Sequence, residues 1–309
     1  MAESRYAMSG PVVTALNFYP IKSCAGTPLE VADIGPRGIL HDREFMLTYP
    51  NGRFITQREL PHLAQIHPTL TDGTLALAAP GMPPVAIEPT DAGPRQPVVV
   101  WRDTVLAVDQ GPVIADWLSS FLETPVRLMR MPADTVRRLD PQYAPRASDQ
   151  VGFADGYPLL LISEESLDDL NSRLASPLPM NRFRPNVVVR GASKAYAEDE
   201  WADLSIGAVR FNGVKTCARC AITTTDQVTA ERGLEPLATL ANYRRIERGV
   251  LFGQNLVHAA PGRIAIGDVL TVHAYADPPT VNGSNRPLSS ATGGGQRDQV
   301  PHSGREAAM

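Results

Sequence analysis

Apolar residues recur at alternate positions near the N-terminus, as they do in strands that bury one face. Within residues 12–19, Val12, Leu16 and Phe18 fall on the same face of an extended chain, which predicts a strand. Later apolar segments are expected to form strands as well, at residues 186–190, 205–211, 256–258 and 264–273.

Two glycine dipeptides lie between short apolar segments. Asn51-Gly52 separates residues 45–49 from 53–56, and Asp72-Gly73 separates residues 68–70 from 75–77. Because both central residues of a tight hairpin turn need positive φ, these dipeptides predict two hairpins. Short strands joined by regular turns predict a barrel or a sandwich rather than alternating strands and helices.

Two other segments have helical spacing. Residues 112–122 place apolar side chains on one helical face. A second helix is expected after Ser163, whose side chain can cap its start, with Glu164 and Glu165 in the first turn where acids suit the helix dipole. The predicted class is mainly β with a few helices (α+β). The apolar stripes contain Val113, Ile114, Trp117, Leu118, Phe121 and Leu122 in the first helix, and Leu167, Leu170 and Leu174 in the second.

The composition changes twice along the chain. Residues 123–150 are rich in Pro, Arg and Asp, which places a domain boundary there. The expected units are a β-barrel domain at 11–130 and a second β-barrel domain at 131–275. From 276 to 309, Pro, Gly, Ser, Asn and Gln dominate, which predicts a disordered tail.

The overall composition narrows the function classes. Hydrophobic residues make up 43% of the chain and the formal net charge is -4, so a general nucleic-acid-binding surface is not expected. Three cysteines in 309 residues favour a reducing compartment over a disulfide framework. No apolar run approaches the ~18–20 residues that span a bilayer, and residues 1–10 do not read as a secretory signal. A soluble, cytoplasmic protein is expected.

Two of the three cysteines form the motif Cys217-Ala218-Arg219-Cys220. A structural zinc site would need two further ligands, such as Cys24 and a histidine. A redox dithiol normally lies in a strand–helix context that is missing here. Two buried structural cysteines are the third interpretation. Arg219, next to Cys220, favours the thiolate and hence a reactive or metal-ligating cysteine.

Polar and basic clusters occur at three strand ends. Lys22 and Ser23 follow the first strand, Arg43 precedes the segment 45–49, and Arg184 and Asn186 enter the segment 186–190. An ammonium, a hydroxyl and guanidinium groups suit an anionic ligand, although a solvated polar loop explains each cluster equally well when it is considered alone. The glycine-containing segment 251–255 is expected to be a structural turn before a strand.

Together, these clusters and their order resemble the MOSC-domain family. The resemblance is greatest to its two-domain members, such as the mitochondrial amidoxime-reducing component and its bacterial relatives, which have an N-terminal β-barrel domain before the MOSC domain. It covers roughly residues 11–275. The segments that carry it are residues 19–24, 42–43, 155–164, 170–174, 181–186, 196–201, 219–224, 235–237, 243–244 and 251–254.

The resemblance implies a molybdenum cofactor, a molybdenum–dithiolene on a pterin with a phosphate. In the family, the cysteine that matches Cys220 ligates the metal. Ala218 stands where eukaryotic members have serine, so one hydrogen bond to the cofactor is expected to be missing. The residues that match cofactor-holding positions are Lys22, Ser23, Arg43, Arg184 and Asn186, followed by Asp155, Gly156, Tyr157, Arg219 and Asn255.

The implied reaction is the two-electron reduction of the N–O bond in N-hydroxylated small molecules. Asp155 is a candidate proton donor from its loop position. Some relatives carry a C-terminal [2Fe–2S] domain, which needs four cysteines, whereas residues 276–309 contain none. The expected electron donor is therefore a separate ferredoxin- or cytochrome b5-like protein with a flavoprotein reductase.

Two other functions remain open from the sequence. MOSC domains also form part of molybdenum-cofactor sulfurases, so Cys220 could carry a persulfide, or the chain could carry the cofactor. No pyridoxal-phosphate-type desulfurase domain is recognised in the sequence, which fits a carrier rather than a complete sulfurase. The third possibility is a non-catalytic interaction module with packed cysteines.

Overall fold

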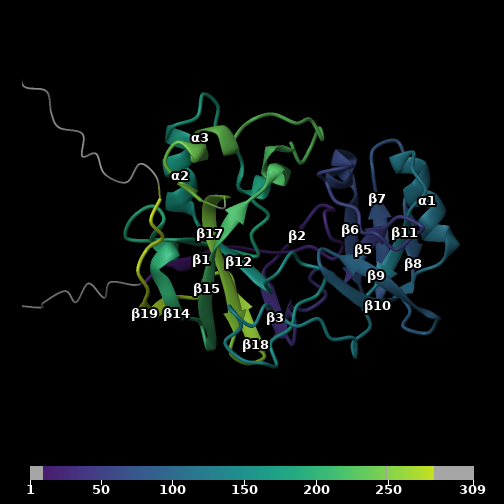
Figure 1. Ribbon diagram of the computed structural model, residues 1–309, viewed down its shortest axis with the longest axis horizontal. Coiled ribbons are helices and arrows are strands. Elements are labelled where there is room, and N and C mark those ends of the chain that lie inside the picture. The colour runs from purple at the N-terminus through teal and green to yellow at the C-terminus, as the bar shows by residue number, and fades with distance from the viewer. Residues whose placement is uncertain (1–9, 248, 282–309) are drawn as a thin grey trace, which may run out of the picture.

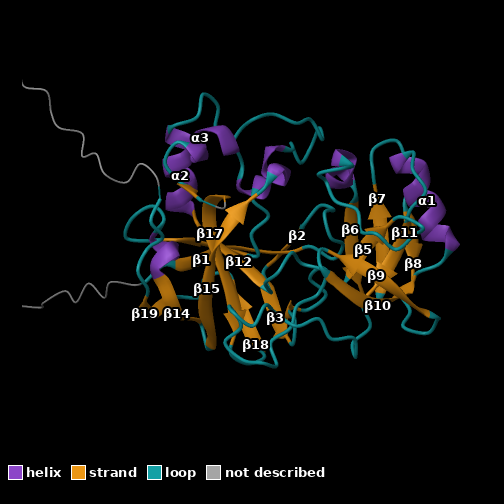
Figure 2. Ribbon diagram, viewed as in Figure 1, coloured by secondary structure: helices purple, strands orange, loops and turns teal. Residues whose placement is uncertain are grey.

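The computed structural model describes residues 10–247 and 249–281, and the protein is mainly β with a few helices, as predicted (Figures 1 and 2). The part of the predicted disordered tail from residue 282 onward lies outside the described residues, and residues 276–281 form no regular element. No helix within the described ranges is long and apolar enough to cross a membrane. The content of strands and helices confirms the prediction of the fold class.

The larger part of the molecule is built on one mixed sheet. Its strands follow the order β19-β14-β15-β17-β12-β13-β1-β2, with β16 paired to β17. A second sheet, β18-β3-β4, lies with it; we call both together the large-sheet half. The strands are β1 (Val12–Phe18), β2 (Thr27–Leu29), β3 (Val31–Gly35), β4 (Gly38–Ile39), β12 (Leu159–Ser163), β13 (Val187–Arg190), β14 (Trp201–Ile206), β15 (Val209–Arg219), β16 (Arg245–Ile246), β17 (Gly249–His258), β18 (Gly262–Ala265) and β19 (Leu270–Tyr275).

The smaller part contains two antiparallel sheets, β5-β11-β10-β9 and β6-β7-β8, and the helix α1. We call this part the small-sheet half, and it lies on the right in Figure 1. Its core contains Phe45, Leu63 and Leu118. The elements are β5 (Phe45–Thr48), β6 (His67–Thr71), β7 (Thr74–Ala78), β8 (Val85–Ile87), β9 (Arg95–Val100), β10 (Asp103–Asp109), α1 (Pro112–Leu122), β11 (Arg127–Arg130) and the 3-10 helix Pro61–Gln65.

The strand pairing ties the start of the chain to its second half. β1 pairs with β13, with Leu16 opposite Val187, and β3 pairs with β18, with Ile34 opposite Gly262. These contacts bury Val13 and Leu16 in the same core cluster as Phe211. The domain limits 11–130 and 131–275 stay a prediction, and the first strands are hydrogen-bonded across the division.

The two predicted hairpins turn differently. In the β6–β7 turn, Asp72 and Gly73 have φ of 49° and 78°, as a two-residue hairpin turn requires. At Asn51-Gly52, only Gly52 has positive φ, 81°, and its N–H bonds to the Tyr49 carbonyl at 2.9 Å. Pro50 holds φ near −65° at the second position of this wider turn. The segment 53–56 therefore forms isolated bridges, and the prediction of a strand there is wrong.

Two later segments also differ from their predictions. Residues 205–211 are not one strand, because Gly207, with φ of 54°, turns the chain between β14 and β15. Residues 251–255 are not a turn before a strand, because they lie within β17. Similarly, 264–273 divides into β18 and β19, which belong to different sheets. These three errors have the same cause. A glycine in an apolar segment indicates a turn or a bulge, but the sequence does not say which of the two forms there.

The helices are close to their predicted positions. α1 covers Pro112–Leu122 as expected, although Val113, 64% exposed, lies outside its buried face. α2 (Glu164–Ser172) begins after Ser163, whose hydroxyl accepts the Ser166 N–H. The remaining helices are α3 (Leu237–Ala241) and the 3-10 helices Met180–Arg182, Ala197–Glu200 and Ala221–Thr224.

Gly253 is required where the pairing of β17 with β15 is irregular and β17 also lies against β12. Its φ is 83°, and an added Cβ would lie 2.7 Å from Ile162 Cγ1 and 3.0 Å from the Leu161 carbonyl oxygen. We expect Gly253→Ala to lower the free energy of unfolding by about 2–3 kcal/mol, since it combines backbone strain with overpacking. Urea denaturation measures this. Gly81→Ala is the control: φ is 73° but nothing lies within 4 Å, so it should cost about 1 kcal/mol. Equal losses would contradict the packing argument.

Candidate functional site

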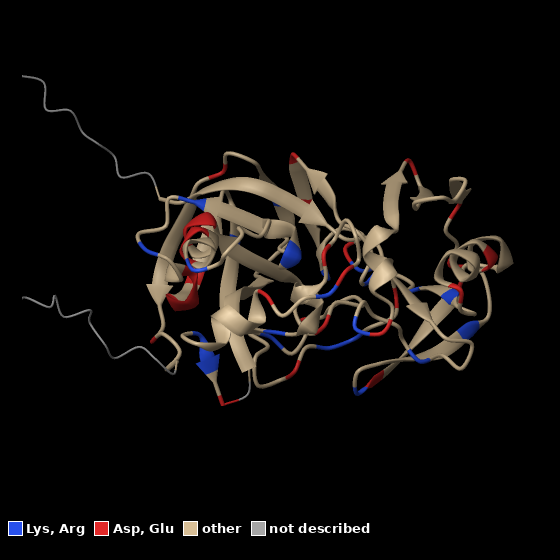
Figure 3. Ribbon diagram, turned by 90° about the horizontal axis from the view of Figure 1, so that it is seen from above, with Lys and Arg blue, Asp and Glu red and all other residues tan. Residues whose placement is uncertain are grey.

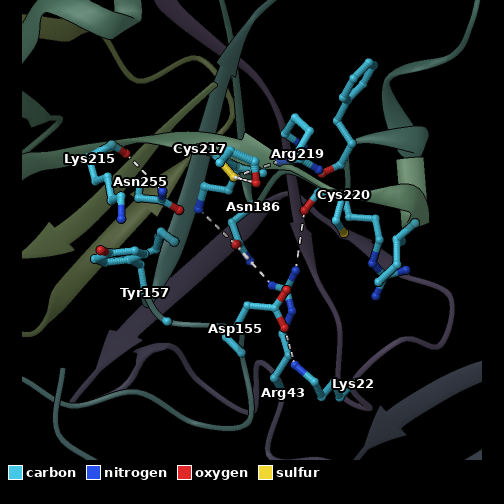
Figure 4. Close-up of a pocket in the computed structure, with 18 of the residues that line it drawn as sticks. Lys22, Arg43, Asp155, Tyr157, Asn186, Lys215, Cys217, Arg219, Cys220 and Asn255 are labelled. Atoms are coloured by element: carbon cyan, nitrogen blue, oxygen red, sulfur yellow. Dashed lines mark hydrogen bonds and ion pairs between the residues drawn. The ribbon is translucent and has the colours of Figure 1, made fainter. Parts of the chain in front are cut away.

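A cavity of about 330 Å³ opens where the ends of β15 and β17 meet the loops after β1 and β4 and the loops before β12 and β13. In Figure 4, Lys22, Arg43 and Asp155 lie on one side of it and Cys217, Arg219 and Cys220 on the other. The structure brings every site residue predicted from the sequence to this cavity: Lys22, Ser23, Arg43, Asp155, Gly156, Tyr157, Arg184, Asn186, Arg219, Cys220 and Asn255. Their roles stay predictions.

Cys220 directly follows β15, and its sulfur contacts an arginine that is distant in sequence. Arg58 Nη2 lies 2.8 Å from Cys220 Sγ. Arg219 does not make this contact; it donates instead to Cys217 Sγ at 3.1 Å and to the Phe183 carbonyl at 2.6 Å. The expectation that Arg219 stabilises the Cys220 thiolate is therefore corrected. The positive charge at this sulfur comes from Arg58, because Arg219 faces the same side of β15 as Cys217, whereas Cys220 lies beyond the end of the strand.

The third cysteine lies away from this cavity. Cys24 is fully buried in the core of the small-sheet half, and burial raises the pKa of its thiol to about 12. Within residues 10–247 and 249–281, no three His, Cys, Asp or Glu side chains come together as a metal-binding group. Cys24 therefore does not join Cys217 and Cys220 in a zinc site of the kind that the spacing left open.

Lys22 and Asp155 form an ion pair at the rim of the cavity. Lys22 is 4% exposed, and its ammonium donates to the Phe153 carbonyl at 2.8 Å and to the Asp155 carboxylate. Partial burial acts to raise the pKa of Asp155, but the charges of Lys22 and then Arg58 outweigh it and hold that pKa below its usual range. An ionised carboxylate has no proton to give at neutral pH, so the structure argues against Asp155 as the proton donor.

The depressed pKa makes a testable pH prediction. A carboxylate with a lowered folded-state pKa stabilises the fold fully above its unfolded pKa of about 4, and this contribution is lost as the pH falls through the folded value. We expect Asp155→Asn to cost about 1 kcal/mol, a small value because the Asp155 side chain is 57% exposed. The Tm difference from the unmutated protein should stay constant from pH 5 to 8 and shrink below pH 4. A difference that changes near pH 6 would contradict the lowered pKa.

Two arginines enclose one tyrosine ring beside the cavity. The guanidinium carbons of Arg43 and Arg184 lie 4.0 and 4.3 Å from the centre of the Tyr19 ring. Arg43 also donates to Asp42 at 2.5 Å and to Asn186 Oδ1 at 3.1 Å. Asn186 is 1% exposed and bonds in addition to Leu160 N, so its amide positions Arg43 and joins β1 to β13.

Arg184 differs from Arg43 because it has no acidic partner. It is 9% exposed, and no ion pair of its side chain occurs among the described residues. Burial, together with the nearby charge of Arg43, lowers its pKa to about 10. Its backbone has φ of 55°, in the left-handed region that favours glycine. A buried cation held in a strained position beside a cavity suits an anionic ligand.

Other lining groups complete the walls. Asn255 in β17 donates to the Lys215 carbonyl at 2.9 Å, and the Lys215 ammonium lies 4.2 Å from the centre of the Tyr143 ring. Tyr143 in turn packs edge-on against Tyr157. Ser23 has φ of 69° and lies 5% exposed at the loop after β1. Basic and acidic segments alternate in the middle of the molecule, where the two halves meet (Figure 3).

Two residues near Cys220 were missed by the sequence analysis. Arg58 lies in the segment Thr56-Gln57-Arg58-Glu59, which looks like a solvated turn. Trp101 lies at the tip of the β9–β10 turn, where its indole donates to Asp155 at 3.2 Å and its ring lies 4.7 Å from the Arg58 guanidinium carbon. No local signal marks either residue, because each acts through contacts with the other half of the molecule.

The donor set fits a large anionic group with a soft metal. Arg58 Nη1 and Arg219 Nε are buried and have no hydrogen-bond partner among residues 10–247 and 249–281, although buried polar groups normally have one. Lys22, Arg43 and Arg184 add three cations around the cavity, and Cys220 supplies one sulfur, a ligand type that soft metals prefer. These residues fit a phosphate-bearing metal cofactor.

Comparison with known proteins gives consistent matches. Residues 10–125 match the MOSC N-terminal beta barrel domain, and residues 148–271 match the MOSC domain. The chain is 36% identical to human mitochondrial amidoxime-reducing component 1, over 83% of this chain and 81% of the relative. It is 35% identical to rat mitochondrial amidoxime reducing component 2, with the same coverages. It is also 31% identical to the molybdenum cofactor sulfurase of Bos taurus, over 81% of this chain but 30% of that protein.

Proposed function

The chain belongs to the MOSC family, with an N-terminal MOSC beta barrel domain before its MOSC domain, and on this basis we propose that it is a molybdenum-cofactor-dependent reductase of N-hydroxylated compounds. The observation that carries the proposal is the convergence on one cavity of Cys220 with the cations Lys22, Arg43 and Arg184. The names of the amidoxime-reducing relatives point to the same reaction class.

Different residues of the cavity would bind different parts of the cofactor. Arg184, which lacks an acidic partner, and Lys22 would hold the phosphate and pterin end, because both charges border the cavity. The Cys220 thiolate would ligate the metal. When bound, the cofactor would supply the two electrons that cleave the N–O bond, and the protein would supply orientation and electrostatics.

The protein groups around the reaction centre have distinct tasks. Arg58 would hold Cys220 Sγ in place by a charge-assisted hydrogen bond. Asp155 balances Lys22 and Arg58, so the cavity is not left with an excess of adjacent positive charges. Reduction of N–OH to N–H with release of water consumes two protons. We assign no proton donor, because Asp155 is held ionised.

We also propose that a separate protein delivers the electrons. The sequence contains three cysteines, whereas a [2Fe–2S] cluster needs four ligands, and Cys220 is assigned to the metal. A ferredoxin- or cytochrome b5-like donor with a flavoprotein reductase would fit this need. A cytoplasmic location remains part of the proposal and rests on the sequence composition.

The decisive experiment combines metal analysis with an activity assay. The full chain is purified from a host that makes the cofactor, and molybdenum and pterin are quantified. The product is then measured after an amidoxime is supplied with a chemical or protein reductant. We expect close to one molybdenum per chain and amidine formation. Protein without molybdenum and without turnover would overturn the proposal. A stable persulfide on Cys220 without turnover would favour the sulfur-carrier function instead.

A further inference from the structure

A second, larger cleft adjoins the cavity that contains Cys220. Its volume is about 1010 Å³, and it lies between the β9–β10 turn and residues 136–141. Asp155, Gly156 and Tyr157 line both spaces, so the two lie next to each other along this loop. Neither Lys22 nor Arg184, which are assigned above to the phosphate and pterin end, lines the second cleft. It is therefore a separate compartment that shares the loop of Asp155, Gly156 and Tyr157 with the cavity of Cys220.

Trp101 is held at the edge of this cleft by a costly backbone conformation. It occupies the first central position of the two-residue turn between β9 and β10, since Val100 pairs with Asp103. Its φ is 56°, whereas Arg102 does not have positive φ. Glycine is the usual residue at this position of such a turn, and positive φ in a bulky residue is a genuine outlier. The retention of a tryptophan there indicates a use for its ring.

The contacts of Trp101 fix the ring but leave part of it uncovered. The indole donates to Asp155 Oδ1 at 3.2 Å, Phe54 packs against the ring edge-on at a centroid distance of 5.0 Å, and the Arg58 guanidinium carbon lies 4.7 Å from its centre. Trp101 is nevertheless 43% exposed. A held, partly exposed aromatic side chain at the edge of a cleft can serve as a stacking platform for a flat ligand.

Two of the three arginines that line the cleft are paired with acids. Arg102 bonds to Asp140 and Arg137 to Asp103, each at 2.7 Å, and Arg138 donates to the Ser148 carbonyl. The apolar lining comes from Phe54, Val105, Val136, Leu139 and Val151. A lining whose charges are mostly paired and whose walls are aromatic suits an uncharged ring rather than a phosphate or a strongly charged chain.

We infer that this cleft is the substrate-recognition site and that it selects N-hydroxylated groups attached to a flat aromatic ring, with Trp101 as the stacking platform. The ring lies against Trp101, and the N–O group extends past Asp155 and Tyr157 into the cavity of Cys220. The inference rests on the proposed reductase function for the identity of the reacting group. Trp101 acts as a specificity-determining residue that contacts substrate.

The test compares an aromatic with an aliphatic amidoxime. Trp101→Gly removes the ring and keeps the turn, because glycine adopts positive φ without steric cost. We expect the ratio of kcat/KM for benzamidoxime to that for acetamidoxime to fall about five- to tenfold, mainly through KM for benzamidoxime. Trp101→Phe should retain this ratio within about twofold. Val99→Ala, in the same hairpin but outside the cleft, should leave it unchanged. An unchanged ratio in Trp101→Gly would overturn the inference.

A binding measurement separates this inference from the proposed function. Trp117 and Trp201 are buried, so quenching of tryptophan fluorescence in the full-length protein by benzamidoxime reports mainly on Trp101. Saturation-transfer NMR then compares benzamidoxime binding in Trp101→Gly, where an about five- to tenfold weakening is expected. If binding weakens in this way but no form of the protein reduces either amidoxime, the cleft inference stands and the reductase function fails. If turnover occurs but Trp101→Gly changes neither the binding nor the ratio, the reductase function stands and the cleft inference fails.

Discussion

Cys220→Ser is expected to lower amidoxime reduction by at least about 100-fold. Even loss of a residue that only orients a metal ligand commonly costs 10–100-fold, and Cys220 would be the ligand itself. Serine lacks the soft sulfur that the metal prefers. Because serine is close to cysteine in size and Cys220 is only half-buried, the variant should still fold. The measurement is kcat/KM for an amidoxime, together with molybdenum content and the Tm of the same preparation.

Cys217→Ser is the matched control for this substitution. Cys217 lies three residues earlier on β15, lines the same cavity, and contacts Arg219 rather than Arg58. We expect its activity to stay within about threefold of the unmutated protein, since the sulfur would not ligate the metal. Equal losses in both variants would show that the two cysteines act as a pair. Full activity in Cys220→Ser would remove the basis of the proposed function.

Arg184→Met is expected to remove cofactor binding and to stabilise the cofactor-free protein. The side chain is a buried cation without an acidic partner, and its pKa is lowered to about 10. Replacing a buried charge by a similar-sized apolar group is often neutral or stabilising by about 1–4 kcal/mol. Methionine also keeps the backbone cost of the positive φ unchanged. We expect at least about tenfold less pterin per chain, and a higher Tm for the cofactor-free form.

Arg182→Met tests whether the result is specific to the unpaired arginine. Arg182 lies in the same segment, but it bonds to Asp226 at 2.8 Å. Removing it leaves that carboxylate without its partner, so we expect destabilisation by about 1–2 kcal/mol and unchanged pterin content. A destabilised Arg184→Met variant with normal pterin content would show that Arg184 serves the fold rather than the ligand.

Arg184→Met is expected to raise the stability of the cofactor-free protein and Arg182→Met to lower it, because the site contains features that destabilise the fold. Arg184, Ser23 and Trp101 have positive φ, and Arg184 is a buried cation without a counter-ion. Such features lower stability and persist where the surrounding structure enforces them. A ligand that binds only the folded state returns this stability by mass action. The Tm of the protein should therefore rise when its cofactor is bound.

Local chemistry explains which elements were predicted correctly. α1 begins at Pro112 and ends at Leu122 because proline suits the first helical turn and the apolar spacing continues until there. The Asp72-Gly73 turn formed as expected because both residues tolerate positive φ. The segment around Gly207 was misjudged, because an apolar run with one glycine describes a single strand and a hairpin equally well.

The candidate site shows the same limit at longer range. The sequence identified residue types that suit an anion and a soft metal, and the order of its motifs pointed to the family; the structure brings those residues together in one cavity. Sequence proximity suggested Arg219 as the partner of Cys220, but Arg219 ends β15 and faces Cys217, whereas Cys220 lies beyond the strand. The contact is made by Arg58, 162 positions away.

The sequence by itself therefore determined the mainly β class and the positions of α1 and α2, because these depend on local propensity. Through the resemblance of its motifs to the MOSC family, it also identified part of the cavity lining. Only the tertiary structure decided which cation faces Cys220, that Arg184 has no counter-ion, and that Trp101 borders a second cleft. These features depend on how the large-sheet and small-sheet halves meet, and side-chain contacts between distant segments leave no periodic trace in the sequence.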